Sequence, residues 1–334
     1  MAKHKYQPKT KEELRTLCQD ESIYLGDIDT SKVTDMSKLF MDSTRKDFSG
    51  IEKWDVSNVK DMSGMFCRAE HFNHDIGNWD TSNVKDMSGM FSGAHFFNQD
   101  ISQWDTSKVE SMYLMFADTE SFNQPIGKWN VSNVKDMFGM FQAALKFNQP
   151  LNDWNVSNVK YMTSMFEYAN EFNQPLDRWD TSNVEDMKCM FRGTESFNQD
   201  ISSWNVSKVK NMASMFESTK SFNQPLDKWN TSNVECMNHM FCESKSFNQP
   251  IGNWDVSNVK DMKSMLYLAD SYDCFVPNRN KYDLKYLDTK TFNLILKKSS
   301  IEKVNHTIVN LKQNKIENSN KKLNTISHNY DESR

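Results

Sequence analysis

The chain has 334 residues, of which 25% are charged and 12% aromatic, and its formal net charge is −5. This balance indicates a folded polypeptide rather than a disordered one, and it lacks the global basic field that binds nucleic acid. No run of eighteen apolar residues occurs, so we expect no membrane span.

Residues 1–27 predict an N-terminal cap made of a helix and a strand. Thr10 and Glu13 have the spacing of a capping box, which predicts a helix over residues 11–19. The apolar segment 23–25 predicts a short strand. The first residues are polar and basic, so we do not expect a secretory signal there.

The central part of the chain repeats with a period of 25 residues. All nine tryptophans lie on one series with this step: Trp54, Trp79, Trp104, Trp129, Trp154, Trp179, Trp204, Trp229 and Trp254. A fixed period of this length is typical of a solenoid, in which each unit buries its apolar face against its neighbours. We therefore predict a solenoid over residues 28–275, with a degenerate first unit over 28–53 and nine clear units from Trp54.

Each unit is predicted to contain a short helix followed by a very short strand or extended rung. After Ser57, which is a good N-cap, the apolar residues recur at spacings of three and four. They are Val59, Met62, Met65, Phe66 and Ala69. Asp55 is placed to close an Asx turn on the backbone. Phe72 and Asn73 predict the start of a parallel rung that stops early, because proline follows in five units.

Two columns of side chains are predicted to stack from unit to unit. Asn73 and its equivalents are expected to satisfy backbone groups of the neighbouring unit through their amides. Trp79 and its equivalents are expected to form a column of indoles. Both columns would hold successive units in register.

Metal binding is the chemical alternative to a structural role for some polar residues. One column could bind calcium only if its oxygens converged, and turn capping competes because Asp and Asn alternate freely there. It begins with Asp55, Asp80, Asp105 and Asn130. His71, His74 and His95 could hold a metal, or could simply face solvent. We predict no metal, no cofactor and no catalytic residue, since no phosphate-binding loop or nucleophile motif occurs.

The C-terminal part differs from the repeat in charge. The last 59 residues carry twelve Lys and Arg against six Asp and Glu, so the net −5 of the chain leaves −11 on the residues before 276. Residues 276–312 predict a C-terminal cap with a helical segment, and residues 313–334 predict a disordered Lys/Asn-rich tail. The six cysteines show no paired spacing, which favours a reducing compartment.

The repeated motif has a known counterpart. W-[DN]-[VT]-S-x-V-x-x-M-x-x-M-F, followed by F-N-[QH]-[DP]-[IL], covers Trp54 to Tyr272. It resembles the BspA-like, leucine-rich-repeat-related bacterial surface-protein family, in its mycoplasma-lipoprotein type of repeat. The resemblance implies an α/β, leucine-rich-repeat-like solenoid with a binding face and no catalytic residues. It also implies adhesion or host interaction at the cell surface, whereas the unpaired cysteines and absent signal favour the cytoplasm, so the location stays open.

A candidate binding patch lies where the units differ. The position after the first methionine varies, and it holds Tyr113 and Phe138 in adjacent units, which we expect about 5 Å apart. Tyr161 and Tyr168 lie in the next unit. Together these four residues form a candidate patch for a partner. The alternative is that Tyr113 and Phe138 flank the apolar arc and extend the core.

From these features we expect a monomeric, non-enzymatic scaffold that binds a protein through one long face. Nucleic acid is not expected as a partner. Two alternatives stay open. One is a metal-dependent or enzymatic module that uses deviant repeat residues or the C-terminal segment, and the other is a structural spacer.

Overall fold

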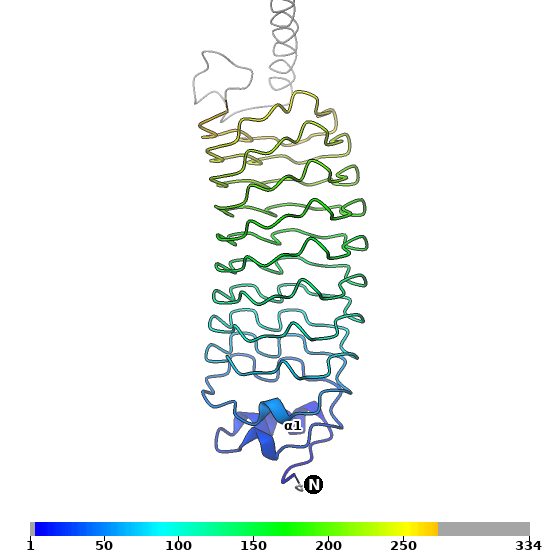
Figure 1. The fold of residues 1–334 in the computed structure, drawn as a ribbon, viewed down its shortest axis with the longest axis vertical. Coiled ribbons are helices and arrows are strands. Elements are labelled where there is room, and N and C mark those ends of the chain that lie inside the picture. Colours follow the sequence, from blue (N-terminus) through cyan, green and yellow to red (C-terminus); the bar gives the residue numbers. More distant parts are fainter. Residues whose placement is uncertain (1–3, 273–334) are drawn as a thin grey trace, which may run out of the picture.

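A computed structural model describes residues 4–272, which form a stack of 25-residue coils with the N-terminus at one end (Figure 1). The chain is therefore a repeat protein. Within residues 4–272 no helix is long and apolar enough to cross a membrane. The cap predicted over 276–312 and the tail predicted over 313–334 lie outside the described residues.

The N-terminal end of the stack carries the predicted helix, α1, over Lys11–Gln19. The Thr10 hydroxyl accepts a hydrogen bond from the Glu13 amide at 3.2 Å, as a helix N-cap does. The buried Arg45 guanidinium donates to the carbonyl oxygens of Cys18 and Ile23. It thus satisfies an end carbonyl of α1 and ties the helix to the first coil.

The strand predicted over 23–25 is wrong. The Ile23 amide instead donates to the carbonyl of Asp20, and the chain continues as the 3₁₀ helix η1, Leu25–Asp27. The parallel bridge at this end joins Tyr6 to Ile28, which stands where later coils have tryptophan. The short side-chain turn at Asp20 bends the backbone too early for residues 23–25 to extend.

A second 3₁₀ helix, η2, covers Ile51–Lys53 and leads into the first tryptophan. It follows Gly50, which has a φ of 94°. A Cβ at this position would approach the backbone of Gly26 closely. The positive φ and this close approach each exclude a side chain at position 50. The two 3₁₀ helices therefore lie against each other beneath the first full coil.

The short helix predicted in every unit is wrong, because residues 28–272 contain successive turns instead. The Met65 amide donates to Met62, and the Ala69 amide donates to Phe66, so each turn closes over three residues. The third residue of each has a positive φ, 61° at Gly64 and 54° at Arg68, as type II turns require. Chained turns place apolar residues at spacings of three and four just as a helix does.

The amides that a helix would use internally instead join neighbouring coils. The amides of Met62, Gly64 and Phe66 donate to carbonyls one coil further along the chain, over 2.7–3.0 Å. Parallel bridges recur at this run, from Asp61 to Asp86 and onward every 25 residues. We call residues 60–68 and their equivalents the ladder wall. The parallel rung predicted at Phe72 and Asn73 is therefore misplaced: the bridges lie in the ladder wall, and Phe72 and Asn73 form none.

The interior of the stack is built from aromatic columns. The rings of Phe66 and Phe91 stack with centroids 5.7 Å apart, and those of Trp79 and Trp104 stack at 6.4 Å and 3°. Each indole also donates to a carbonyl of the preceding coil, as Trp104 does to Ile76 at 3.1 Å. A fully buried phenylalanine contributes about 1.5–3 kcal/mol, and in this array that burial is supplied by the adjacent coils.

The asparagine ladder is confirmed. The Asn98 amide donates to Oδ1 of Asn73 at 3.0 Å, and Nε2 of Gln99 donates to the same oxygen at 3.0 Å. The pattern recurs in each coil up to Asn248. The Asx turn is also confirmed, since the Ser57 amide and hydroxyl both donate to Oδ1 of Asp55. Ser57 is therefore part of a turn and not an N-cap.

Candidate interaction surface

Tyr113 and Phe138 lie side by side on the ladder wall. Their ring centroids are 5.0 Å apart with planes 16° from parallel, and the Leu114 amide donates to the Phe138 carbonyl at 2.8 Å. Tyr113 keeps 39% of its surface exposed, and Phe138 is half-buried. The pair therefore lies on the outside of the wall, with its own contact across two coils.

Tyr161 continues this pair onto the next coil. It occupies the bridge column, where most coils have aspartate, and is 46% exposed. Two coils earlier the equivalents of Phe138 and Tyr161 are Ser88 and Ser111, whose hydroxyls are 2.7 Å apart. The repeat geometry thus makes Phe138 and Tyr161 neighbours. We call Tyr113, Phe138 and Tyr161 the aromatic stripe.

Tyr168 lies apart from the aromatic stripe. It is seven residues beyond Tyr161, at a left-handed turn position with a φ of 57°. Its ring lies 5.5 Å from the guanidinium of Arg192 and fills the space over Gly193 of the next coil. Of the four patch residues, the structure therefore groups three and places Tyr168 in a separate contact.

A polar groove of about 370 Å³ lies across the coils that carry Tyr113 and Phe138 and the coil before them. We call it the first groove, and it is lined by Lys85, Lys108, Glu110, Asn133 and Lys135. Lys108 donates to Oδ1 of Asn83, and Lys135 donates to Glu110 at 3.0 Å. That hydrogen bond holds the pKa of Glu110 below its ordinary value. Three ammonium groups thus face one carboxylate.

The first groove and the aromatic stripe share two coils. Tyr113 follows Glu110 by three residues, and Phe138 follows Lys135 by three residues. Three residues of extended chain span at most about 10 Å. Met112 and Met137 are buried in the coil interior. The exposed side chains on either side of them therefore project outward together.

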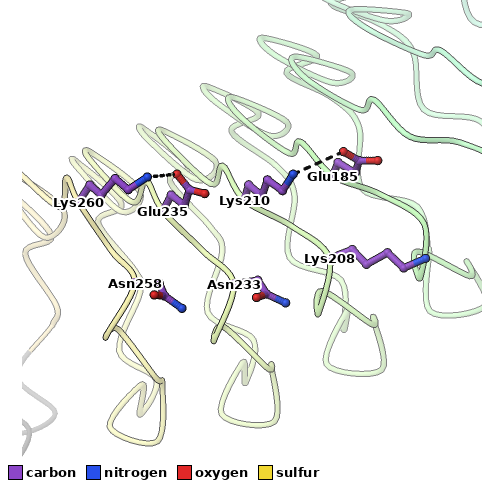
Figure 2. Close-up of a pocket in the computed structure, with 7 residues that line it drawn as sticks. All are labelled: Glu185, Lys208, Lys210, Asn233, Glu235, Asn258 and Lys260. Atoms are coloured by element: carbon purple, nitrogen blue, oxygen red, sulfur yellow. Dashed lines mark hydrogen bonds and ion pairs between the residues drawn. The ribbon is translucent and has the colours of Figure 1, made fainter.

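An equivalent groove lies four coils further along (Figure 2). We call it the second groove; its volume is about 520 Å³ and its lining is Glu185, Lys208, Lys210, Asn233, Glu235, Asn258 and Lys260. Ion pairs join Lys210 to Glu185 at 4.0 Å and Lys260 to Glu235 at 2.5 Å. Three lysines therefore face two glutamates, and the charge is more nearly balanced than in the first groove.

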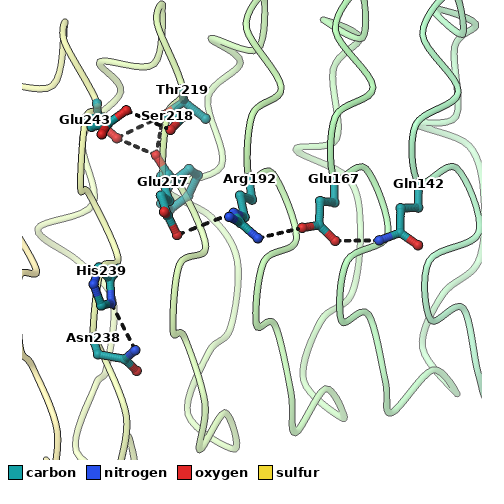
Figure 3. Close-up of polar contacts among 11 residues, drawn as sticks. Gln142, Glu167, Arg192, Glu217, Ser218, Thr219, Asn238, His239 and Glu243 are labelled. Atoms are coloured by element: carbon teal, nitrogen blue, oxygen red, sulfur yellow. Dashed lines mark hydrogen bonds and ion pairs between the residues drawn. The ribbon is translucent and has the colours of Figure 1, made fainter.

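The second groove has no aromatic edge. The positions equivalent to Tyr113 and Phe138 are Ala213 and Asn238. Ala213 is buried, and Nδ2 of Asn238 contacts Nδ1 of His239 at 3.1 Å (Figure 3). The two grooves therefore share their backbone framework and differ in what borders them.

A row of polar and charged side chains crosses successive coils (Figure 3). Nε2 of Gln142 donates to Glu167 at 2.7 Å, and Arg192 lies 3.2 Å from Glu167 and 3.4 Å from Glu217. We call these four residues the polar row. The Glu167 side chain is only 7% exposed, so its charge needs these partners. The polar row is thus satisfied within the chain.

The five cysteines in the described part of the chain are free thiols. Burial, followed by the nearby Glu167 carboxylate, raises the pKa of Cys189 to about 11. Burial also raises the pKa of Cys242 to about 12. Both thiols stay protonated near neutral pH and are poor nucleophiles there.

Neither of the two candidate metal sites has converging ligands. Between residues 4 and 272 no group of three His, Cys, Asp or Glu side chains could hold an ion. In the Asp55 column the Oδ1 atoms accept their own turn amides, as Asp55, Asp80, Asp105 and Asn130 do. Nδ1 of His95 lies 3.6 Å from Glu120, with its side chain about half-exposed. Turn capping therefore explains this column.

Sequence reasoning missed both grooves. No prediction was made for their columns, because exposed asparagine and lysine form no recognisable motif. A signal was nevertheless present: among the nine clear units, lysine replaces the column's asparagine only at Lys108 and Lys208. These two positions are four units apart, and each marks a groove.

Comparison with curated proteins and with solved structures finds no match. A family model, described as Mycoplasma protein of unknown function, DUF285, matches residues 13–123, 97–191 and 171–278. These overlapping segments contain most of α1 and every coil that the structure describes. The chain therefore belongs to the DUF285 family.

Proposed function

We propose that this chain is a non-enzymatic scaffold that binds a protein through the ladder wall. The aromatic stripe carries the proposal. At its positions other coils use serine or aspartate without harm to the stack, so packing does not require aromatic rings there. Exposed tyrosine and phenylalanine in one cluster are typical of binding hot spots. The scaffold is proposed to act as a monomer.

The same proposal includes a relationship to the BspA-like, leucine-rich-repeat-related surface proteins. Nine copies of the tryptophan–methionine motif support it, of which eight end in phenylalanine and the last in Leu266. The parallel bridges of the ladder wall agree with a solenoid of that kind, whereas the turns in residues 28–272 stand where an α/β repeat would have helices. Adhesion or host interaction at the cell surface is the corresponding biological role.

The test compares two matched variants for capture of a saturable protein partner. The first combines Tyr113→Ser, Phe138→Ser and Tyr161→Asp, each of which installs the residue that other coils carry at that position. The control makes Ala213→Ser and Asn238→Ser at the equivalent places of the second groove. Crosslinking with quantitative mass spectrometry identifies partners, and titration then measures affinity.

The stripe variant is expected to bind at least about 10-fold more weakly, whereas the control stays within about two-fold. Both variants should melt within a few degrees of the original protein. Equal affinity of the stripe variant and the original protein would contradict the proposal. Absence of any saturable protein partner would leave the structural spacer as the better function.

A further inference from the structure

The first groove is a basic site on an acidic protein. Three groove lysines face one groove carboxylate, Glu110, which pairs with Lys135 and also lies within reach of the charge of Lys85. Asp80, which does not line the groove, interacts with Lys108. The groove residues therefore keep an excess of positive charge. The residues before 276 together carry a net charge of −11. A local excess of positive charge in such a background selects for an anionic ligand, because long-range repulsion elsewhere disfavours one.

The groove also offers a hydrogen-bond acceptor. Nδ2 of Asn133 donates to the Ser107 carbonyl at 2.7 Å. Two coils earlier the equivalent oxygen, Oδ1 of Asn83, accepts from Lys108, but among residues 4–272 no hydrogen bond to Oδ1 of Asn133 is formed. A ligand that carries both anionic groups and N–H donors therefore matches this groove. A polypeptide has both, whereas a polyphosphate chain has no N–H donor.

The aromatic edge points to the same class of ligand. The rings of Tyr113 and Phe138 stack, so one face of each ring is covered by the other ring. The pair therefore presents ring edges and the tyrosine hydroxyl, and it leaves no cleft between two open ring faces. A nucleobase binds by stacking on an open aromatic face. The edge of a stacked pair instead packs well against an apolar side chain.

The dimensions fit a short extended segment. The first groove runs across three coils, from Lys85 to Lys135, which is about 10 Å at the spacing of parallel strands. An extended peptide rises about 3.3 Å per residue, so three to four residues span the groove. Its alternate side chains would reach the lysines while one neighbour reaches the aromatic stripe.

From these features we infer that the partner of the scaffold presents an extended acidic peptide segment with an apolar side chain. Its carboxylates bind Lys85, Lys108 and Lys135, and its apolar side chain packs on the aromatic stripe. This proposal rests on the scaffold function above and names the chemistry of its partner. The second groove, which lacks the aromatic edge and has a better balanced charge, is the internal control.

The test titrates the full chain with fluorescein-labelled peptides and follows fluorescence anisotropy. The peptides are extended twelve-residue sequences that vary in their number of glutamates and contain either one phenylalanine or serine in its place. Lys85→Gln, Lys108→Asn and Lys135→Gln together neutralise the first groove. Lys208→Asn, Lys210→Gln and Lys260→Gln do the same in the second groove. Asparagine is native to the Lys108 column, so folding should be retained.

Glutamate-rich peptides with phenylalanine are expected to bind, and neutralising the first groove should weaken them at least about 10-fold. Neutralising the second groove should change affinity by less than about two-fold. Binding should also weaken as salt rises from about 50 mM to about 300 mM. No binding of acidic peptides, or an equal loss in both variants, would overturn the inference. So would tighter lysine-dependent binding of oligothymidylate or heparin.

Failure of this inference is distinguishable from failure of the scaffold function. If the stripe variant loses the native protein partner while the first-groove variant keeps it, the scaffold stands and the acidic segment is wrong. If neither variant loses the partner, both proposals fail. Loss in both variants supports both proposals.

Discussion

The coils around the first groove and those around the second groove share one interior and differ on the ladder wall. Phe141 in the first region and Phe216 in the second are equally buried and stack on their neighbours at 5.6 Å and 5.5 Å. On the wall, the first region exposes the aromatic stripe. The polar row begins with Gln142 and Glu167 on the coils of Phe138 and Tyr161, and it continues through Arg192 and Glu217 into the second region, which has no aromatic stripe.

This difference separates two kinds of departure from the repeat. Glu167 and Arg192 are unusual residues for their column, but each finds its partner in an adjacent coil. Tyr113 and Tyr161 are equally unusual, yet they remain exposed. A departure that is compensated within the chain stabilises the stack, whereas one that stays exposed is available to another molecule.

The largest expected effect tests whether the interior is the same in both regions. Phe141→Ala and Phe216→Ala should each lower the local free energy of unfolding by about 3–5 kcal/mol, since each leaves a cavity between coils. The two losses should agree within about 1 kcal/mol. Native-state hydrogen exchange measures them coil by coil, because long arrays do not unfold as one unit. A tolerated substitution at one site only would break the comparison.

The polar row should matter for stability where the first groove does not. Glu167→Ala leaves the Gln142 amide and one side of Arg192 unpaired, and should cost about 1–2 kcal/mol, a value kept low because Arg192 is partly exposed. Glu110→Ala removes an exposed partner of Lys135 and should leave the melting temperature unchanged. Thermal melts followed by circular dichroism compare the two variants. Equal destabilisation would show that the polar row is no more structural than the groove.

The aromatic edge should be transferable between the regions. Ala213→Tyr with Asn238→Phe places a ring pair beside the second groove, in a chain whose own stripe is removed by Tyr113→Ser and Phe138→Ser. Affinity for the acidic, phenylalanine-containing peptide should then recover about five- to ten-fold, measured by anisotropy. The parent without the graft is the control. No recovery would mean that the first groove owes its selectivity to something other than the aromatic edge.

The smallest expected effect concerns the stability of the fold at low pH. Hydrogen bonds from the Ser182 hydroxyl and amide hold the pKa of Asp180 below its ordinary 3.8, and Ser82 does the same for Asp80. Because the folded pKa is the lower one, this stabilisation is present above about pH 4 and is lost as pH falls through the folded value. The equivalent Asn130 makes the same turn without ionising.

Asp80→Asn and Asp180→Asn should therefore leave the melting temperature at pH 7 nearly unchanged and reduce its fall at pH 3. The shift should be alike in the two regions, since both turns have the same contacts. A loss of stability at pH 7 would show that the charge itself, and not the turn, is what these positions need.

The period and its stacked columns could be predicted because they depend on contacts between equivalent residues. Trp79 contacts Trp104, and Asn73 contacts Asn98, so a step of 25 in the sequence becomes a neighbour in space. The turns could not be separated from a helix by spacing alone, since Met62, Met65 and Phe66 suit both. Glycine at positions 64, 89 and 139 was the available sign of a positive φ.

The candidate surface was predictable only in part. The variable column identified Tyr113 and Phe138, and their adjacency follows from the period. Tyr168 was grouped with them by closeness in sequence, but the left-handed turn carries it towards Arg192. The grooves lie between rows of side chains that come from several coils. They are a property of the assembled ladder wall and are not present in any single unit.

The asparagine ladder also determines how this chain can change in length. Every donor in it, such as the Asn98 amide, belongs to the later coil, and every acceptor, such as Oδ1 of Asn73, belongs to the earlier one. A whole coil can therefore be inserted or removed wherever the ladder hydrogen bonds on both of its sides follow this pattern. The change must involve all 25 residues of the coil. Unequal recombination between such similar coding units would yield longer and shorter descendants that fold without further adjustment, each with its grooves moved by whole coils.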